Sequence, residues 1–399
     1  MVHDMIISGD THIVEPPDLY ASRITGKMKG RVPRIKRQKM ADGRDFDAWF
    51  IGDTQVVTLG AVTQAGRRFE DTSKIDFVGV WEDVRQGAYE PHAMIKELAI
   101  DGIWGAVVQP SQGLFWYHLD DSELLSALCR AYNEWIADFC RPYPGRLRGI
   151  GMINVDDVAE ACEELERCAT LGLGGVFIPV TPLPGRPYRD PMYERFWATA
   201  QDVDLPLLMH LATQRANVPG CEISISFKTF TPAGLRPTQD YWVRYALTDM
   251  IFAGVCERYP RLRVGSVEHE ISWAPHWLKQ MDYTYKERPV YSGYKSKEGL
   301  LPSDYWRRNM FAVFQEDDVA VQLRHRIGID NLLWGNDFPH SESTWPKSQE
   351  FLQQMFQEVP AEERRKLLLD NAVRIFRFAP DERGAQSPMQ SLEDEEAGC

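Results

Sequence analysis

Acidic and histidine side chains follow several short apolar segments of the chain, and these residue types could bind a metal ion. One segment leads into Asp10-Thr11-His12, a second ends at Met209-His210, and a third leads into Glu268-His269-Glu270. A fourth leads into Asn336-Asp337-Phe338-Pro339-His340. Residues two apart in a strand point to the same side, so Asp10 and His12 could hold one ion together. Such ligands suit Zn²⁺ or Mn²⁺, with a position left open for water or substrate.

These residues need a scaffold that brings distant parts of the chain together. Eight short and mostly apolar segments are predicted to be strands: Met5–Asp10, Trp104–Pro110, Leu147–Val155, Gly174–Val180, Leu205–Leu211, Leu262–Glu268, Met310–Phe314 and Leu332–Asp337. Such strands are typical of a parallel sheet covered by helices. The candidate ligands thus follow the first, fifth, sixth and eighth strands, at the ends where a barrel places its catalytic residues.

Amphipathic segments alternate with the predicted strands. Asp121–Phe139 has apolar residues three and four positions apart. Val158–Leu171 repeats this pattern and ends before Gly172, which suits a helix C-terminus. Further helices are expected at Asp190–Val203, Trp242–Tyr259, Ser348–Gln357 and Pro360–Phe376. The alternation predicts an α/β fold, a (β/α)₈ TIM barrel. An open doubly wound sheet is the alternative, but no glycine-rich dinucleotide-binding turn follows an early strand.

The first two predicted strands are separated by roughly ninety residues, which is too long for a single crossover helix. We expect a rim insertion at about residues 23–87, containing a hairpin formed by Phe46–Ile51 and Gln55–Leu59. Residues 1–380 are therefore predicted to form a single barrel domain. Residues 381–399 contain mostly Gly, Ser, Gln and acidic residues, and we expect them to be a disordered acidic tail.

The composition excludes several classes of protein. The formal net charge is −13, which disfavours a nucleic-acid or anionic-membrane partner. No apolar run is long enough to cross a membrane, and the N-terminus lacks the pattern of a signal peptide. The seven cysteines include no CxxC pair and are typical of reduced thiols. We therefore expect a cytoplasmic protein that acts on a small molecule.

Other catalytic motifs are missing from the sequence. His269-Glu270 does not begin a zincin motif, because Trp273 stands where the second histidine would be needed. The sequence contains no GxSxG elbow and no GxxxxGK[ST] loop, which argues against a serine hydrolase and a phosphate-loop enzyme. The predicted fourth strand has no lysine, the residue that commonly bridges a second metal when carboxylated. We therefore expect one divalent ion.

Seven motifs together resemble a known family. They are residues 10–16 (Asp-Thr-His-Ile-Val-Glu-Pro), 174–176, 190–191, 205–206 with His210, 268–275, 334–340 and 371–376. On these motifs the chain resembles the amidohydrolase superfamily. Within it, the likeness is to the amidohydrolase-related branch that includes aminocarboxymuconate-semialdehyde decarboxylase and the resorcylate and carboxyvanillate decarboxylases. The likeness extends over nearly the whole predicted barrel.

The resemblance implies roles for individual residues. His12, His210 and Asp337 are implied to be metal ligands, and His269 is implied to be the catalytic histidine beside the metal. Asp10 replaces the first histidine of the superfamily's common His-x-His opening, and a carboxylate there is what the hydroxybenzoate-type decarboxylases show. Ser272 stands where those enzymes often have a glutamate, which leaves the substrate class open. Family analogy also implies a homodimer.

Four more residues are candidates to hydrogen-bond the metal ligands or to line the substrate pocket. Trp116 follows the second strand and could wall a pocket or pack at the rim. Arg215 follows the fifth strand and could pair with a substrate carboxylate or be solvated. His340 could hydrogen-bond into the site or cap the turn at Pro339. Glu15 could shape the rim or hydrogen-bond a ligand.

Two reactions could use the same metal ligands. In the first, the metal chelates a hydroxy-carboxylate, and a protonated Asp337 or His269 delivers a proton to carbon as carbon dioxide departs. In the second, Asp337 or His269 takes a proton from metal-bound water, which attacks an amide, a lactone or a carbon–carbon bond. We favour non-oxidative decarboxylation of an aromatic or unsaturated hydroxy-carboxylate. Hydrolysis is the alternative, and a catalytically inactive binding barrel is a third.

Overall fold

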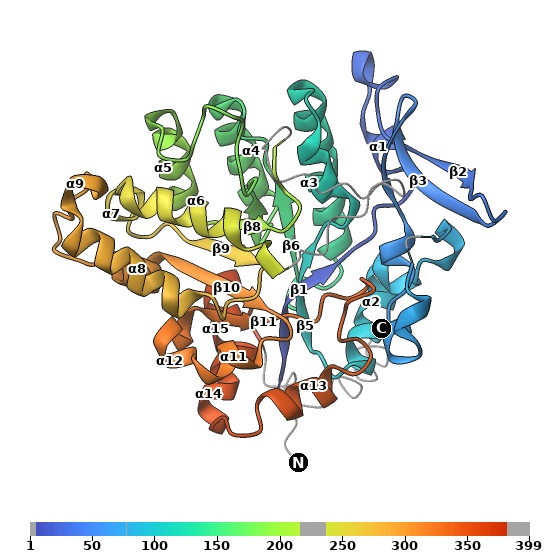
Figure 1. Cartoon of the computed structure of the whole chain (residues 1–399). Helices are drawn as coiled ribbons and strands as arrows, with labels where there is room; N and C mark the ends of the chain where they lie inside the picture. Colours follow the sequence, from blue (N-terminus) through green and yellow to red (C-terminus); the bar gives the residue numbers. More distant parts are fainter. Residues whose placement is uncertain (1–4, 77, 216–236, 381–399) are drawn as a thin grey trace.

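Eight parallel strands form the centre of the molecule (Figure 1). The computed structural model describes residues 5–76, 78–215 and 237–380, so the predicted tail at 381–399 lies outside the described residues. The strands are adjacent in chain order: β1 (Ile7–His12), β5 (Gly105–Gln109), β6 (Leu147–Met152), β7 (Gly175–Phe177), β8 (Leu207–His210), β9 (Val264–Val267), β10 (Met310–Phe314) and β11 (Leu332–Trp334). Each overlaps one predicted strand, and the predicted (β/α)₈ architecture is confirmed.

Backbone hydrogen bonds join β1 to the segment that follows β11. The N–H of Asp337 donates to the carbonyl of Asp10 at 2.9 Å, and the N–H of His12 donates to the carbonyl of Phe338 at 2.6 Å. Gly335 permits this approach, because a Cβ at this position would lie 2.5 Å from Cβ of Asp10. The sheet is thereby nearly closed into a barrel, and the residues after β1 and β11 lie side by side.

A buried polar network ties this junction to two helices. The side-chain oxygen of Asn336 accepts hydrogen bonds from the hydroxyls of Ser8 and Thr11, and its amide nitrogen donates to Asp101 at 3.1 Å. Asp101 follows α2 (Pro91–Ile100) and also accepts hydrogen bonds from Ser348, the first residue of α13 (Ser348–Met355). Burial raises the pKa of Asp101 to about 6. One carboxyl group therefore links the barrel, α2 and α13.

Helices cover the outside of the barrel (Figure 1). They are α3 (Ser122–Cys140), α4 (Val158–Thr170), α5 (Glu194–Asp202), α6 (Tyr241–Phe252), α7 (Val255–Arg258), α8 (Ala274–Glu287), α9 (Pro289–Ser292), α10 (Pro302–Asn309), α11 (Asp318–Gln322), α12 (Arg324–Ile327), α14 (Ala361–Arg365) and α15 (Asn371–Phe376). The helix expected at 242–259 is instead divided into α6 and α7, since Gly254 has a φ of 72°. A π-helical turn, Lys366–Asp370, divides the last expected helix into α14 and α15.

The insertion between β1 and α2 begins with α1 (Leu19–Arg23) and contains its own sheet. Strands β2 (Arg34–Lys39), β3 (Asp45–Ile51) and β4 (Thr54–Thr58) are antiparallel neighbours. Strands β3 and β4 form the predicted hairpin. We did not predict β2, because it lies at the edge of the sheet with no buried residue and its sequence has no apolar alternation.

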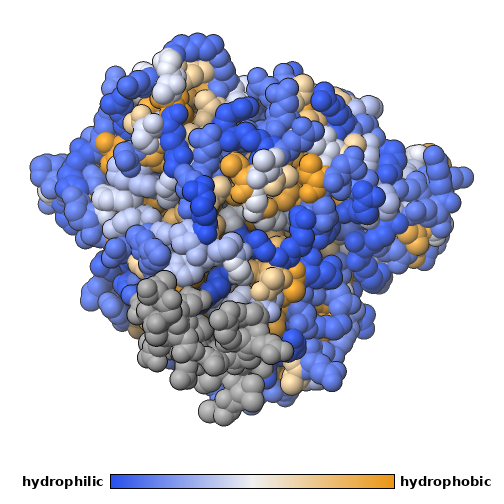
Figure 2. Space-filling model, turned by 180° about the vertical axis from the view of Figure 1, so that it is seen from behind, coloured by the Kyte–Doolittle hydropathy of each residue, from blue (hydrophilic) through white to orange (hydrophobic). Residues whose placement is uncertain are grey.

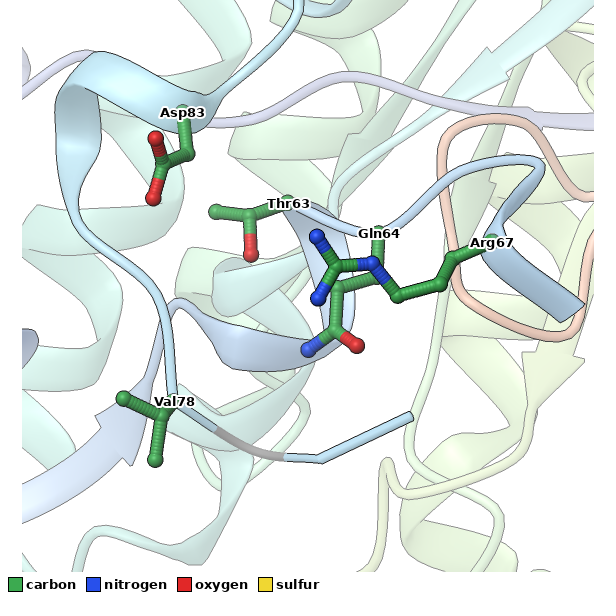
Figure 3. A pocket seen from close by; sticks show the side chains of 5 residues that line it. All are labelled: Thr63, Gln64, Arg67, Val78 and Asp83. Atoms are coloured by element: carbon green, nitrogen blue, oxygen red, sulfur yellow. The ribbon is translucent and has the colours of Figure 1, made fainter. Parts of the chain in front are cut away.

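The insertion also contains a cavity of about 270 Å³ (Figure 3). Figure 3 shows that the side chain of Arg67 extends toward Gln64. The cavity is lined by Thr63, Gln64, Arg67, Val78 and Asp83. None of these residues was predicted as a site residue, and the cavity contains none of the candidate metal ligands.

One large cluster of buried apolar side chains fills the space between barrel and helices. Figure 2 shows mostly hydrophilic residues on one face of the molecule, with scattered apolar patches. Among the described residues, every helix is too short or too polar to cross a membrane. The cysteines that the structure describes are buried and free, as expected of reduced thiols.

Candidate metal centre

Four of the predicted ligands lie together at the carboxyl end of the barrel. Nε2 of His12 is 3.0 Å from Oδ1 of Asp10 and 3.4 Å from Oδ1 of Asp337. Nε2 of His210 is 3.9 Å from Oδ1 of Asp10. Asp10 and His12 belong to β1, His210 ends β8, and Asp337 follows β11. We call these four residues the ligand cluster.

Both histidines of the ligand cluster direct one ring nitrogen into it. Nδ1 of His12 lies 2.7 Å from the carbonyl oxygen of Pro110, and Nδ1 of His210 lies 2.8 Å from that of Leu211. A carbonyl oxygen can only accept, so each Nδ1 carries the hydrogen and each neutral ring presents an Nε2 lone pair. A backbone carbonyl at the far nitrogen is common for metal-binding histidines.

Three buried atoms of the ligand cluster have no hydrogen-bond partner among the described residues. They are Oδ1 of Asp10, Nε2 of His12 and Nε2 of His210. All three are electron-pair donors, and burying them face to face without a proton or cation between them is costly. A divalent ion would satisfy all three. The donor set of imidazole nitrogens and carboxylate oxygens fits Zn²⁺ or Mn²⁺.

Glu268 also reaches this site, although we did not predict it as a ligand. Its Oε2 lies 3.3 Å from Nε2 of His210. The sequence pattern predicted a strand through Glu268, but β9 ends at Val267, and Glu268 has a φ of 60°. Its left-handed backbone could not be read from strand periodicity. The sequence feature that could have identified Glu268 was its position beside His269 at a predicted strand end.

Left-handed backbone recurs around the same rim. Ala212 after β8, Glu270 after β9 and Asp337 after β11 have φ values of 69°, 49° and 58°. Residues other than glycine adopt this conformation at a cost, and such positions concentrate at functional sites. The rim of the barrel therefore carries backbone strain where the candidate ligands lie.

Carboxylates and imidazoles shift one another's pKa values in the ligand cluster. Burial would raise the pKa of Asp10, but the imidazoles of His12 and His210 hold it well below its usual range. Burial raises the pKa of Glu268 well above its usual range, and the charge of Asp337 adds to this effect. Burial likewise raises the pKa of Asp337. These clustered carboxylates create negative charge that a divalent cation would offset.

His269 lies beside the ligand cluster without belonging to it. Its Nδ1 is 3.2 Å from the hydroxyl oxygen of Ser266, and its Nε2 is buried with no partner among the described residues. Burial lowers the pKa of His269 to about 3, and a positive charge on His210 would act in the same direction. The ring is therefore neutral near pH 7.

His340 contacts the ligand cluster from the outside. Its Nδ1 is 2.7 Å from Oδ1 of Asp337, and its Nε2 is 3.1 Å from the hydroxyl of Ser111. Its ring centre lies 4.1 Å from that of His12. Burial lowers the pKa of His340 to about 4. This placement matches the hydrogen-bonding alternative that we considered for His340.

Arg215 is not placed to receive a substrate carboxylate, and it is not solvated either. The guanidinium is buried and forms a bidentate pair with Asp156, at 3.0 Å from Nε and 2.6 Å from Nη2. Its Nη1 donates to the carbonyl oxygens of Tyr117 and Leu119. We therefore correct our interpretation: Arg215 fixes the loop after β5 to Asp156.

Glu15 and Trp116 are also buried in structural contacts. The carboxylate of Glu15 accepts hydrogen bonds from the backbone N–H groups of Gln112 and Gly113, at 2.9 and 2.7 Å. The indole N–H of Trp116 donates to the hydroxyl of Tyr20 at 2.6 Å. No exposed surface remains on Trp116, so its placement matches rim packing and not a pocket wall. Glu15 shapes the rim by holding the start of the 3₁₀ helix Gln112–His118.

Comparison with known proteins identifies the family of the chain. The family model described as "Amidohydrolase" matches residues 55–378. The chain belongs to the amidohydrolase family. Among curated relatives, a gamma-resorcylate decarboxylase from Rhodococcus jostii (strain RHA1) is 25% identical over 232 residues, which cover 53% of this chain and 66% of the relative. A 2-amino-3-carboxymuconate-6-semialdehyde decarboxylase from Dictyostelium discoideum is 21% identical, covering 65% of this chain and 69% of the relative.

Solved structures of this family share the fold. An amidohydrolase from Mycobacterium avium subsp. paratuberculosis K-10 superposes with a TM-score of 0.75 at 21% identity, covering 94% of this chain and all of that one. A dihydroxybenzoic acid decarboxylase from Polaromonas sp. JS666 gives a TM-score of 0.62 at 16% identity, covering 95% of this chain and 98% of that one. That decarboxylase contains bound manganese and the inhibitor 2-nitroresorcinol. The match to the Rhodococcus relative spans just under two thirds of its length.

Proposed function

We propose that this amidohydrolase-family protein is a metal-dependent enzyme that removes carbon dioxide from an aromatic or unsaturated hydroxy-carboxylate without oxidation. The observation that carries this proposal is the convergence of Asp10, His12, His210 and Asp337. Among the described residues, the facing atoms of the first three have no hydrogen-bond partner. The decarboxylase names of several relatives support the choice of reaction.

A divalent ion held by these four residues would supply positive charge for the carboxylate and hydroxyl oxygens of the substrate. The chain itself must deliver a proton to the carbon that loses carbon dioxide. Asp337 is our candidate donor, because His340 contacts its Oδ1 and can return a proton to it. Ser111 extends this path on the far side of His340.

His269 has a different proposed role. A neutral ring is a poor acid but can accept a proton or a hydrogen bond from a substrate hydroxyl through Nε2. Such an acceptor would orient the ring of the substrate relative to Asp337. We therefore assign proton delivery to Asp337 and positioning of the hydroxyl group to His269.

Release of carbon dioxide tests the reaction directly. We expect the metal-loaded protein to release it from at least one member of a panel of hydroxybenzoates and unsaturated acids. Removing the metal with a chelator should abolish release, and Mn²⁺ or Zn²⁺ should restore it. Metal analysis should find about one ion per chain. Asp337→Asn is the inactive control.

The hydrolase alternative is favoured by one observation. Arg215, our candidate partner for a substrate carboxylate, is committed to Asp156. Amides and lactones should therefore be assayed as substrates alongside the hydroxybenzoates and unsaturated acids. Turnover of an amide or lactone with no carbon dioxide from the acids would replace our proposal with metal-assisted hydrolysis.

A further inference from the structure

We propose that Glu268 is a fifth protein ligand of the metal, so that three carboxylates and two imidazoles bind the ion. This inference rests on the metal site of the proposed function, but not on the identity of the reaction. Glu268 follows β9, a strand that contributes no ligand to the set of four residues predicted from the sequence.

The first argument is distance. The ligand atoms of Asp10, His12, His210 and Glu268 all lie within 4.8 Å of one another. Two ligand atoms on opposite sides of an ion, each bound at about 2.2 Å, are about 4.4 Å apart. A second group of His12, Glu268, Asp337 and His340 has the same span. Glu268 therefore belongs to both groups, and it shares them with His12.

The second argument is the chemistry of its contact with His210. Oε2 of Glu268 lies 3.3 Å from Nε2 of His210. Because Nδ1 of His210 faces the carbonyl of Leu211, the neutral ring has no hydrogen on Nε2 to donate. A lone pair and a carboxylate oxygen then face each other. A cation between them would turn this repulsive contact into two ligand bonds.

The third argument is the fixed position of Glu268. Glu268 has a left-handed φ of 60°, its carboxylate reaches His210, and its carbonyl accepts a hydrogen bond from the side chain of Gln239 at 3.3 Å. Within the described ranges, no lysine or arginine forms an ion pair with the Glu268 carboxylate, whose basic neighbour is the ring of His210. The carboxylate is thus available to a metal.

A fifth ligand changes what the site should bind. Carboxylate-rich sites with six positions suit Mn²⁺, whereas Zn²⁺ in proteins is usually four-coordinate. On an ion with six positions, five protein ligands would leave one for a substrate oxygen. A substrate could then bind through one oxygen atom, and chelation through two would require Glu268 to leave the ion.

Titration of metal-free protein with MnCl₂ by calorimetry tests the inference without measuring turnover. We expect Glu268→Gln to weaken Mn²⁺ binding at least tenfold. This loss equals or exceeds the usual effect of removing a residue that hydrogen-bonds a metal ligand without touching the metal. Glu342→Gln is the matched control. Glu342 is exposed, and its charge raises the pKa values of Glu268 and Asp337. Loss of this nearby charge should weaken binding less than about threefold, since screened surface charges contribute little.

Each outcome has one interpretation. A loss of Mn²⁺ affinity smaller than tenfold in Glu268→Gln would overturn the inference and leave Glu268 as an ion-pair partner of a protonated His210. Absence of Mn²⁺ and Zn²⁺ binding by the wild type would overturn the metal site itself and the proposed function with it. If Glu268→Gln does not fold, as judged by circular dichroism, a crystal structure of the Mn²⁺-loaded wild type decides. A Glu268 oxygen about 2.2 Å from the ion supports the inference, and a distant carboxylate contradicts it.

Discussion

His269 is buried beside the ligand cluster but belongs to neither group of possible ligands. We therefore expect His269→Ala to retain the metal and to lose 10²- to 10⁴-fold in turnover, the usual range for a group that handles a proton. Metal content and kcat, measured on the same preparation, check this. His276→Ala, at an exposed position of α8, is the control. Loss of the metal from His269→Ala would show that His269 is a ligand.

The positions of some site residues could be predicted from the sequence, and those of others could not. Asp10 and His12 lie in β1 and His210 ends β8, and the two-residue spacing of Asp10 and His12 predicts that they share one side. This holds although the register of β1 shifts between Ser8 and Thr11. Their convergence could therefore be predicted. Glu268 could not, because it depends on one left-handed residue. The role of Arg215 depends on its pairing with Asp156, a contact between distant loops that no local pattern encodes.

Among the structural elements, the junction of β1 and β11 depends on the missing side chain of Gly335. In Gly335→Ala, Cβ would meet both Cβ and the backbone nitrogen of Asp10, at 2.5 and 2.7 Å. We expect a loss of about 1–3 kcal/mol in the free energy of unfolding, as for other overpacked positions. Urea denaturation of the metal-free protein measures it. Gly145→Ala, where a Cβ meets nothing within 4 Å, should be nearly neutral. Equal stability of the two variants would contradict the close approach.

Asp101 makes the link between the barrel, α2 and α13 sensitive to pH. Folding raises its pKa from 3.8 to about 6, since burial outweighs the hydrogen bonds from Ser348 and Asn336. The fold thus favours the protonated form, and this stability is present below pH 3.8 and lost as pH rises through 6. Asp101→Asn removes the effect. Its free energy of unfolding should therefore rise relative to wild type by about 3 kcal/mol between pH 3 and pH 7.

Thermal or chemical unfolding at a series of pH values measures this difference. Asp53→Asn, at a fully exposed carboxylate in the turn between β3 and β4, is the control and should show no such trend. A difference between Asp101→Asn and wild type that stays constant with pH would contradict a raised pKa.

The elements themselves were largely predictable. All eight barrel strands appear where apolar runs predicted them, because both faces of a parallel strand are buried. Strand β2 was missed because it is an edge strand with a polar sequence. The long helices expected at 242–259 and 360–376 are interrupted by Gly254 and by a π-helical turn. Such interruptions depend on packing against neighbours, which amphipathic periodicity does not report.

For the whole molecule, the homodimer and the cytoplasmic location remain predictions. We expect light scattering after gel filtration to give twice the 45.8 kDa mass of one chain. The prediction of a dimer rests on family analogy. In addition, the exposed Val290 and Tyr291 of α9 offer apolar surface that a second subunit would cover. A mass of one chain at every protein concentration would contradict the dimer.

The barrel closes where its first and last strands meet, and the proposed metal binds on both sides of that seam. Asp10 and His12 precede Asp337 in the chain and are therefore made before it. A nascent chain therefore cannot hold the ion in its final form until the eighth barrel strand has left the ribosome. In the finished protein, the proposed ion would join the two sides of this seam, and its removal should loosen the seam before the rest of the barrel.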